Sequence, residues 1–271
     1  MLIVFMGVVP ILLQLPIALL GIIPDEYNNA LTEVLVEYMF YPGVTLISFI
    51  ILFLFKENKD LRKVFSLKNN KILYGLLIGF GLNAISVLLA YLFGYLKLAY
   101  SGFNIGLLLI SFISVTIQSA SEEVICRGYL MEKILKDYKS PVLAIMLNSL
   151  IFALFHIFND GASIFSTYSI FVIGILFSLF AYYNGNIWES VAIHTMWNFT
   201  QNFIFGLPNS GYPAIYSIFK ITEAKNGFAY NTVFGVESTI TVLLLDILVI
   251  VIIQLLHKKN QSYDWFLFIS Q

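Results

Sequence analysis

The chain contains a single cysteine and little charge. Only 11% of its 271 residues are charged, whereas roughly a quarter are charged in a typical soluble domain. Because Cys126 has no second cysteine to pair with, an internal disulfide framework is excluded. The net charge is -1, and no cluster of lysine and arginine is interleaved with aromatic residues. The sequence therefore does not indicate a nucleic-acid-binding surface.

Long hydrophobic runs dominate the sequence, and 59% of its residues are hydrophobic. A membrane-spanning helix needs about 20 predominantly apolar residues. The runs of suitable length are 2–23, 36–55, 72–96, 105–136, 141–158, 164–183, 188–205 and 238–256. They predict an all-α, polytopic transmembrane bundle of about eight helices that forms one integral membrane domain over residues 1–271. We expect the first run to be a retained helix, because no basic residue precedes Lys56 and no small-residue cleavage site follows it.

Basic residues indicate the orientation of this bundle. Most of them gather in three stretches, 56–71, 127–139 and 258–259, which lie on one side of the membrane if the helices alternate. The other side has only Lys97, Lys220 and Lys225. Because cytoplasmic loops carry the excess of lysine and arginine, we expect a cell-membrane protein with both termini in the cytoplasm.

Two segments have features beyond hydrophobicity. Gly75, Gly79 and Gly81 in the third run include a spacing of small residues that lets two helix backbones approach closely. The stretch 206–237 is rich in proline and glycine, and we expect it to be irregular and to cover the outer face or shape access to a site. A fourth helix that starts at Ile105 would be about 48 Å long. We therefore expect a kink, or a later start near Phe112.

Ionisable residues interrupt the fourth run. Glu122, Glu123 and Arg127 stand in an otherwise apolar stretch, and charged groups at membrane depth are costly enough to suggest a function. Glu123 precedes Arg127 by four residues, the spacing of an ion pair on one helix face. We expect that pair to be structural, which leaves Glu122 available for chemistry.

Two later runs each contribute a histidine. Glu122 lies about 21 Å inside the cytoplasmic end of its helix, and His156 lies about 22 Å from the helix start at Pro141, so the two meet at similar depth across a helical hairpin. His194 is only about 12 Å from its helix start, and tilt or a broken start must bring it level. Asn198 follows His194 by four residues and shares its helix face.

These residue types together suit peptide hydrolysis. A carboxylate and an imidazole can hold a water between them, with Glu122 as the base and His156 orienting the water. Donors are then needed for the developing oxyanion, and His194 with Asn198 can supply them. The sequence therefore predicts catalytic residues Glu122, His156, His194 and Asn198, with no metal or other cofactor.

The motifs that carry these residues resemble a known family. Glu122-Glu123-x-x-x-Arg127, Phe152-x-x-x-His156 and His194-x-x-x-Asn198 stand on successive predicted helices. In this order they look like the motifs of the CAAX protease and bacteriocin-processing family of intramembrane glutamic endopeptidases, related to the Ras-converting CAAX enzyme. The flanks 127–130 and 185–190 are similar too, whereas Cys126 replaces the usual aromatic residue. The similar region covers about residues 118–202, within a motif-bearing catalytic core at 105–205.

The resemblance implies the same catalytic roles for these residues. Glu122 would activate water with His156, and His194 with Asn198 would stabilise the oxyanion. The substrate would be a membrane-associated protein or peptide in the lipid bilayer, with or without a lipid anchor. The substrate itself stays open, because many prokaryotic members are linked to peptide maturation, bacteriocin immunity or regulation of membrane partners.

Other interpretations use the same residues. Glu122, His156 and His194 could be zinc ligands, although the chain has no His-Glu-x-x-His helix. A non-catalytic immunity or regulatory protein would use them as structural contacts, and a proton-coupled transporter would use the buried carboxylates, although no inverted repeat is found. We interpret Cys126 as a small core residue, His257 as interfacial, and Asp246 as facing a polar interior.

Overall fold

A computed structural model gives the fold of the chain and describes Tyr38, residues 42–43, 64–67 and 71–260. The two expected helices at 2–23 and 36–55 lie outside the described residues, apart from Tyr38 and residues 42–43. Among the described residues, the elements in chain order are α4 (Ile72–Leu92), β1 (Leu96–Tyr100), α5 (Ile105–Glu123), η3 (Val124–Met131), α6 (Glu132–Tyr138), α7 (Pro141–Leu154), α8 (Ile164–Asn184), α9 (Trp188–Phe199), η4 (Thr200–Ile204), β2 (Phe219–Ala224), η5 (Val236–Ser238) and α10 (Ile240–Asn260).

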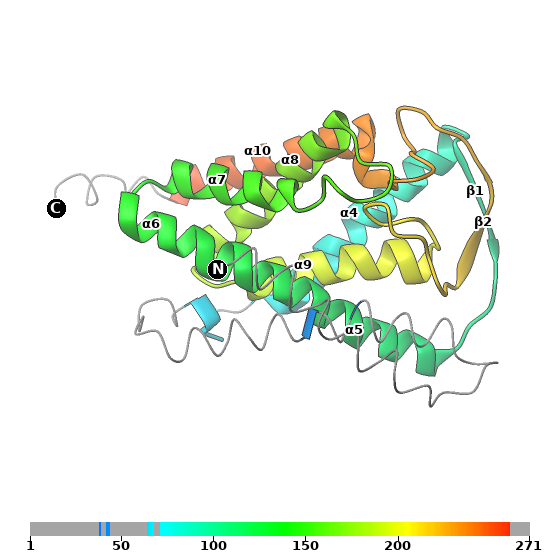
Figure 1. The fold of residues 1–271 in the computed structure, drawn as a ribbon, viewed down its shortest axis with the longest axis horizontal. Helices are drawn as coiled ribbons and strands as arrows, with labels where there is room; N and C mark the ends of the chain where they lie inside the picture. The colour runs from blue at the N-terminus through cyan, green and yellow to red at the C-terminus, as the bar shows by residue number, and fades with distance from the viewer. Residues whose placement is uncertain (1–37, 39–41, 44–63, 68–70, 261–271) are drawn as a thin grey trace.

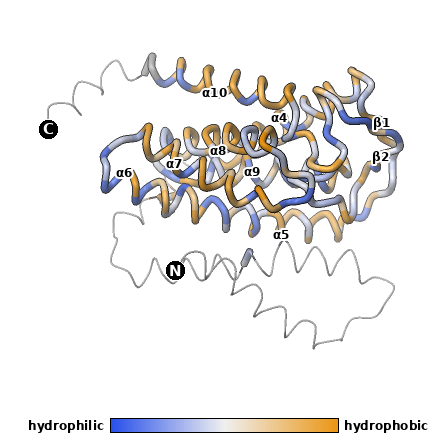
Figure 2. Tube along the Cα trace, turned by 45° about the horizontal axis from the view of Figure 1, so that its top comes forward, coloured by the Kyte–Doolittle hydropathy of each residue, from blue (hydrophilic) through white to orange (hydrophobic). Residues whose placement is uncertain are grey.

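The protein is a mostly helical membrane protein. Four helical segments of the described chain are long and apolar enough to cross a bilayer, namely Ile72–Leu92, Ile105–Tyr138, Ile164–Asn184 and Ile240–His257. Hydrophobic residues follow these helices in Figure 2. The helix expected at 141–158 ends at Leu154 and is shorter than a full span. The described part of the chain therefore does not establish the expected total of about eight membrane helices.

The fourth predicted run forms one long helical segment from Ile105 to Tyr138. The side chain of Asn104 accepts a hydrogen bond from the backbone N–H of Leu107 and so caps its first turn. The alternative start near Phe112 is therefore wrong. Its middle, Val124–Met131, is a π-helix directly after the two glutamates. Such wider turns are frequent at functional sites, and the apolar pattern of the sequence did not predict one here.

A two-stranded sheet corrects the all-α prediction. β1 and β2 pair antiparallel, with Leu96 opposite Ala224 and Tyr100 opposite Phe219. The stretch 206–237 is therefore not irregular throughout, because β2 lies within it. Figure 1 shows this sheet at one end of the molecule and α6 at the other. Lys97 and Lys220 thus lie far from the lysines of α6.

The central helix α9 contacts α4, α5 and α8. Most of its side chains are buried, including those of Glu189, His194 and Asn198. Its packing against α4 depends on two glycines: a Cβ added to Gly75 would lie 2.6 Å from the carbonyl oxygen of Glu189, and one added to Gly79 would lie 2.3 Å from that of Ile193. The expected close approach of backbones is confirmed at these two positions, and it holds the helix that carries His194 against α4.

Replacing Gly79 by alanine is expected to separate α4 from α9. The new methyl group would meet backbone, which cannot move aside, and overpacking of this kind typically costs about 1–3 kcal/mol. Gly81→Ala is the matched control, because a Cβ there has nothing within 4 Å. The thermal midpoint of the detergent-solubilised protein should fall for Gly79→Ala and not for Gly81→Ala. Equal midpoints for the two variants would contradict the close packing.

Candidate active site

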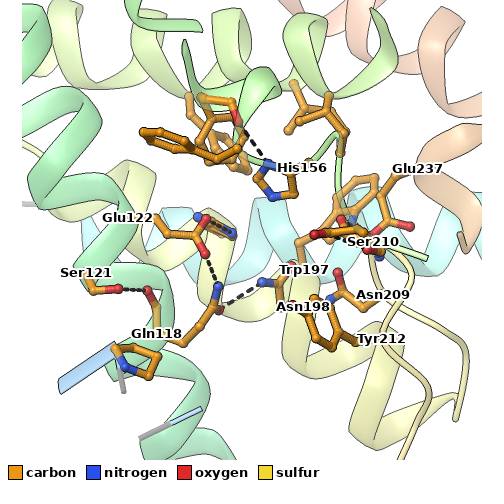
Figure 3. A pocket seen from close by; sticks show the side chains of 18 of the residues that line it. Gln118, Ser121, Glu122, His156, Trp197, Asn198, Asn209, Ser210, Tyr212 and Glu237 are labelled. Carbon is orange, nitrogen blue, oxygen red and sulfur yellow. Dashed lines mark hydrogen bonds and ion pairs between the residues drawn. The ribbon is translucent and has the colours of Figure 1, made fainter. Parts of the chain in front are cut away.

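A cavity of about 470 Å³ contains side chains from all three motifs. Glu122 reaches it from α5, His156 from the turn after α7, and His194 with Asn198 from α9. Figure 3 shows the labelled side chains facing this space. The stretch 206–237 also lines it through Asn209, Ser210, Tyr212 and Glu237. The four residues predicted as catalytic are therefore brought together, and the expected effect of 206–237 on the site's shape has a structural basis.

Glu122 lies in the last turn of α5 with 27% of its side chain exposed. Its Oε1 accepts a hydrogen bond from Nε2 of Gln118, one turn earlier on the same helix. Its Oε2 is buried and accepts no hydrogen bond from the described residues. Nε2 of His194 lies 3.8 Å from this oxygen. A buried carboxylate oxygen without a donor is well suited to accept a proton from a bound water.

His156 lies beyond the end of α7, in a turn rather than in the helix expected at 141–158. Its Nδ1 is 2.9 Å from the carbonyl oxygen of Phe152. Because a carbonyl can only accept, Nδ1 carries the proton and Nε2 keeps its lone pair in the neutral ring. The spacing Phe-x-x-x-His thus has a structural meaning, since the carbonyl four residues earlier sets the tautomer of the imidazole.

His194 and Asn198 occupy one face of α9 but make different contacts. Nδ1 of His194 is 3.1 Å from Oε1 of Glu123, and its ring stacks on Phe177 with centroids 5.0 Å apart. Nδ2 of Asn198 donates to Oε1 of Gln118 at 3.2 Å. These contacts bring His194 level with Glu122, although its distance from the helix start suggested a shallower position. They also connect α9 to α5 at two points.

Glu123 and Arg127 form an ion pair with Nη1 and Oε1 2.9 Å apart, and both side chains are fully buried. Nη2 of Arg127 donates to the carbonyl oxygen of Gly174 at 2.9 Å, and the guanidinium lies 4.4 Å from the ring centroid of Phe152. Counting Arg127 with the surface basic residues was therefore wrong. Glu123 is also more than a structural partner of Arg127, because the same oxygen contacts His194.

Three other predicted residues lie outside the cavity lining. Cys126 is buried in the hydrophobic core, as expected. Asp246 is 1% exposed, and neither of its oxygens accepts a hydrogen bond from the described residues, so the expected polar surroundings are not seen. His257 stacks on Tyr183 with centroids 3.9 Å apart, which indicates a packing contact between α10 and α8.

Two cavity residues were missed by the sequence analysis. Gln118 precedes Glu122 by four residues, and the i,i+4 spacing on α5 could have indicated their contact. No sequence pattern indicated Glu237. It stands among other polar residues in a loop, and only the tertiary fold brings it to the site. It is 2% exposed and lines the cavity that contains Glu122.

Glu237 connects three parts of the fold. Its Oε2 accepts a hydrogen bond from Nε2 of Gln201 at 2.6 Å, and its Oε1 accepts one from the backbone N–H of Ser210 at 3.2 Å. Gln201 in turn accepts a hydrogen bond from Asn83 on α4 at 2.7 Å. Burial is the main cause that raises the pKa of Glu237 from 4.5 to about 7, while these hydrogen bonds lower it in part.

The stability of the protein is expected to depend on the ionisation of Glu237. Below pH 4.5 the carboxyl is protonated in both the folded and the unfolded state. Between pH 4.5 and about 7 the unfolded state ionises while the folded state keeps its proton, so the stability falls as the pH rises. Above about 7 both states are ionised and the loss is complete. The thermal midpoints of wild type and Glu237→Gln are measured from pH 4 to 8. As the pH rises, the midpoint of wild type should fall relative to that of the variant. A pH-independent difference would contradict this assignment.

Within the part of the chain that the structure describes, no group of three or more His, Cys, Asp or Glu side chains is arranged to hold a metal ion.

Comparison with known proteins agrees with the motifs. Residues 104–200 match the family model described as type II CAAX prenyl endopeptidase Rce1-like. This segment runs from the cap of α5 to the first residue of η4 and includes all six predicted site residues. No curated protein and no solved structure is significantly similar to the chain. The predicted resemblance is therefore confirmed over residues 104–200, which are similar to the Rce1-like type II CAAX prenyl endopeptidase family.

Proposed function

We propose that the chain is an intramembrane endopeptidase that hydrolyses a peptide bond of a membrane-associated protein or peptide with a water activated by Glu122 and His156. The observation that carries the proposal is that Glu122, His156, His194 and Asn198 line one cavity. The match to the Rce1-like family supports a CAAX-type protease activity. Residues 1–271 would act as one membrane domain, with a motif-bearing core at 105–205 and both termini in the cytoplasm.

The reaction would begin with a water held between Glu122 and His156. One hydrogen of the water would point to Oε2 of Glu122, which has no other hydrogen-bond donor among the described residues. The other would point to Nε2 of His156, whose lone pair is free because Nδ1 donates to Phe152. Glu122 would take the proton while the water oxygen attacks the carbonyl carbon of the substrate. When the C–N bond breaks, the same proton would pass to the leaving amine.

His194 and Asn198 would stabilise the tetrahedral intermediate. Asn198 uses one hydrogen of its amide for Gln118 and keeps the second for the oxyanion. His194 donates from Nδ1 to Glu123, so its Nε2 donates as well only when the ring carries both protons. Glu123 is the counter-ion for that charge, and we assign it the role of positioning His194 in addition to pairing with Arg127.

The cavity walls suit an apolar segment of substrate. Around the polar groups they are built from aromatic and aliphatic side chains, including Ile125, Phe155, Ile173 and Trp197. Such walls would exclude water other than the reacting one and strengthen the polar contacts inside. The substrate would therefore present an apolar stretch beside the scissile bond, whether or not it carries a lipid anchor.

The test compares purified wild-type protein with Glu122→Gln in liposomes. The substrates are a peptide that ends in a farnesylated CAAX sequence and the same peptide without the farnesyl group. In parallel, the membrane peptidome of cells carrying either version shows which peptides depend on Glu122. We expect products from wild type alone, and the two synthetic peptides show whether prenylation is needed. If no product depends on Glu122 in either assay, the proposed function is wrong.

A second prediction separates water activation by carboxylate and imidazole from zinc chemistry. Loss of one oxyanion donor typically costs about 10²–10³ in turnover, so Asn198→Ala should cleave slowly but measurably. His194→Ala should be severely impaired without any change in bound metal, and wild type should stay active with phenanthroline. Turnover and metal content of the purified proteins are the measurements. Stoichiometric zinc in wild type, lost together with activity in His194→Ala, would favour the metalloprotease alternative.

A further inference from the structure

Gln118 lies between the two halves of the candidate site. It is half-buried on α5 and lines the cavity together with Glu122 and Asn198. Its Nε2 donates a hydrogen bond to Oε1 of Glu122 on the same helix. Its Oε1 accepts a hydrogen bond from Nδ2 of Asn198, on α9, at 3.2 Å. Figure 3 shows this continuous path from the carboxylate through the Gln118 amide to Asn198.

The nitrogen and the oxygen of the Gln118 amide have different functions. Donation from Nε2 occupies Oε1 of Glu122, so that Oε2, which has no donor, faces the water site. At the other end, Oε1 takes one amide hydrogen of Asn198 and leaves the second one for the substrate.

The local sequence holds Gln118 in this orientation. The hydroxyl of Ser119 donates to the same Oε1 at 3.3 Å. The hydroxyl of Ser121 donates to the backbone carbonyl of Gln118 at 2.7 Å. With the oxygen facing two donors and the nitrogen facing a carboxylate, the reversed amide would place like groups against each other. The hydrogen-bond pattern therefore selects one orientation of the side chain.

We propose that Gln118 is a positioning residue that holds the base Glu122 and the oxyanion donor Asn198 at a fixed separation across α5 and α9. The inference rests on the proposed function, because it assigns these roles to Glu122 and Asn198. It goes beyond that function by naming a residue outside the three motifs that couples water activation to oxyanion stabilisation.

Two substitutions test the two ends of the amide. Gln118→Leu removes both hydrogen bonds and keeps a side chain of similar size. Gln118→Glu keeps acceptors for Asn198 but places a second carboxyl group against Glu122. Thr116→Val on the same helix is the matched control. Among the described residues, the Thr116 hydroxyl donates only to the carbonyl oxygen of Phe112, and Thr116 does not line the cavity. The probes are synthetic copies of the peptides whose release from cell membranes depends on Glu122, cleaved in liposomes.

Gln118→Leu should lower kcat and leave KM within about twofold, since it acts on the reacting groups rather than on binding. We expect about a 10–100-fold loss, the size typical of partners that orient functional ligands in metal sites. Gln118→Glu should move the acid limb of the pH–rate profile to higher pH, because two adjacent carboxyl groups resist joint ionisation. A residue that only packs helices together would lower the yield without moving this limb.

The outcomes separate the inference from the function on which it rests. Wild-type kcat in Gln118→Leu, together with an inactive Glu122→Gln, would overturn the role of Gln118 and leave the protease intact. If Gln118→Leu fails to insert, the pH profile of Gln118→Glu decides, and an unmoved acid limb overturns the inference. Equal product release by wild type and Glu122→Gln would overturn the proposed function, and the role of Gln118 with it.

Discussion

Glu122→Gln and His156→Ala are each expected to abolish peptide cleavage while the protein stays inserted in the membrane. The glutamine keeps the size of Glu122 but cannot take the proton of the water, and the alanine removes the lone pair that orients it. Because both groups act on one water, the double variant should be no worse than either single variant. The measurement is single-turnover cleavage of a peptide whose release depends on Glu122.

Both variants must stay folded while they lose cleavage activity. Thermal midpoints of both variants should lie near that of wild type, since Glu122 is partly exposed and His156 lies in a turn. Thr116→Val is again a suitable control for substitution on α5. Wild-type turnover in Glu122→Gln would show that the base lies elsewhere. A double variant much slower than either single one would show that the two groups act independently.

Removing one member of the Glu123–Arg127 pair should strongly destabilise the protein. Both side chains are fully buried, and an uncompensated buried charge costs about 3–5 kcal/mol. Glu123→Leu and Arg127→Met are each expected to lower the yield and the thermal midpoint in detergent. The double variant should recover much of the loss, because apolar groups of similar size can replace a buried ion pair.

Activity distinguishes the two functions of Glu123. If it also positions His194, the double variant should be stable but slow, since Nδ1 of His194 has lost its carboxylate. Cleavage and the thermal midpoint are measured on the same preparations. A double variant that recovers both stability and turnover would reduce Glu123 to an ion-pair partner. Single variants that fold normally would show that the pair is not needed for stability.

The sequence by itself determined which residues of the candidate site could carry chemistry and where most helices of the described chain lie. Ionisable residues in apolar runs stand out because burial is costly for them, and their spacing by four residues indicates a shared helix face. This reasoning led to Glu122, Glu123 with Arg127, and His194 with Asn198. The close packing at Gly79 also followed from a local pattern, because only glycine lets a backbone come so near.

Only the tertiary structure decided the contacts between helices. Gln118 meets Asn198 because α5 and α9 pack together, and Glu123 meets His194 for the same reason. Nothing in the spacing along the chain records such contacts. The strand β2 was missed because its ladder needs β1, more than 100 residues earlier in the chain. The sequence thus determined which polar groups lie among apolar residues, and the packing of helices decided which of them line one cavity.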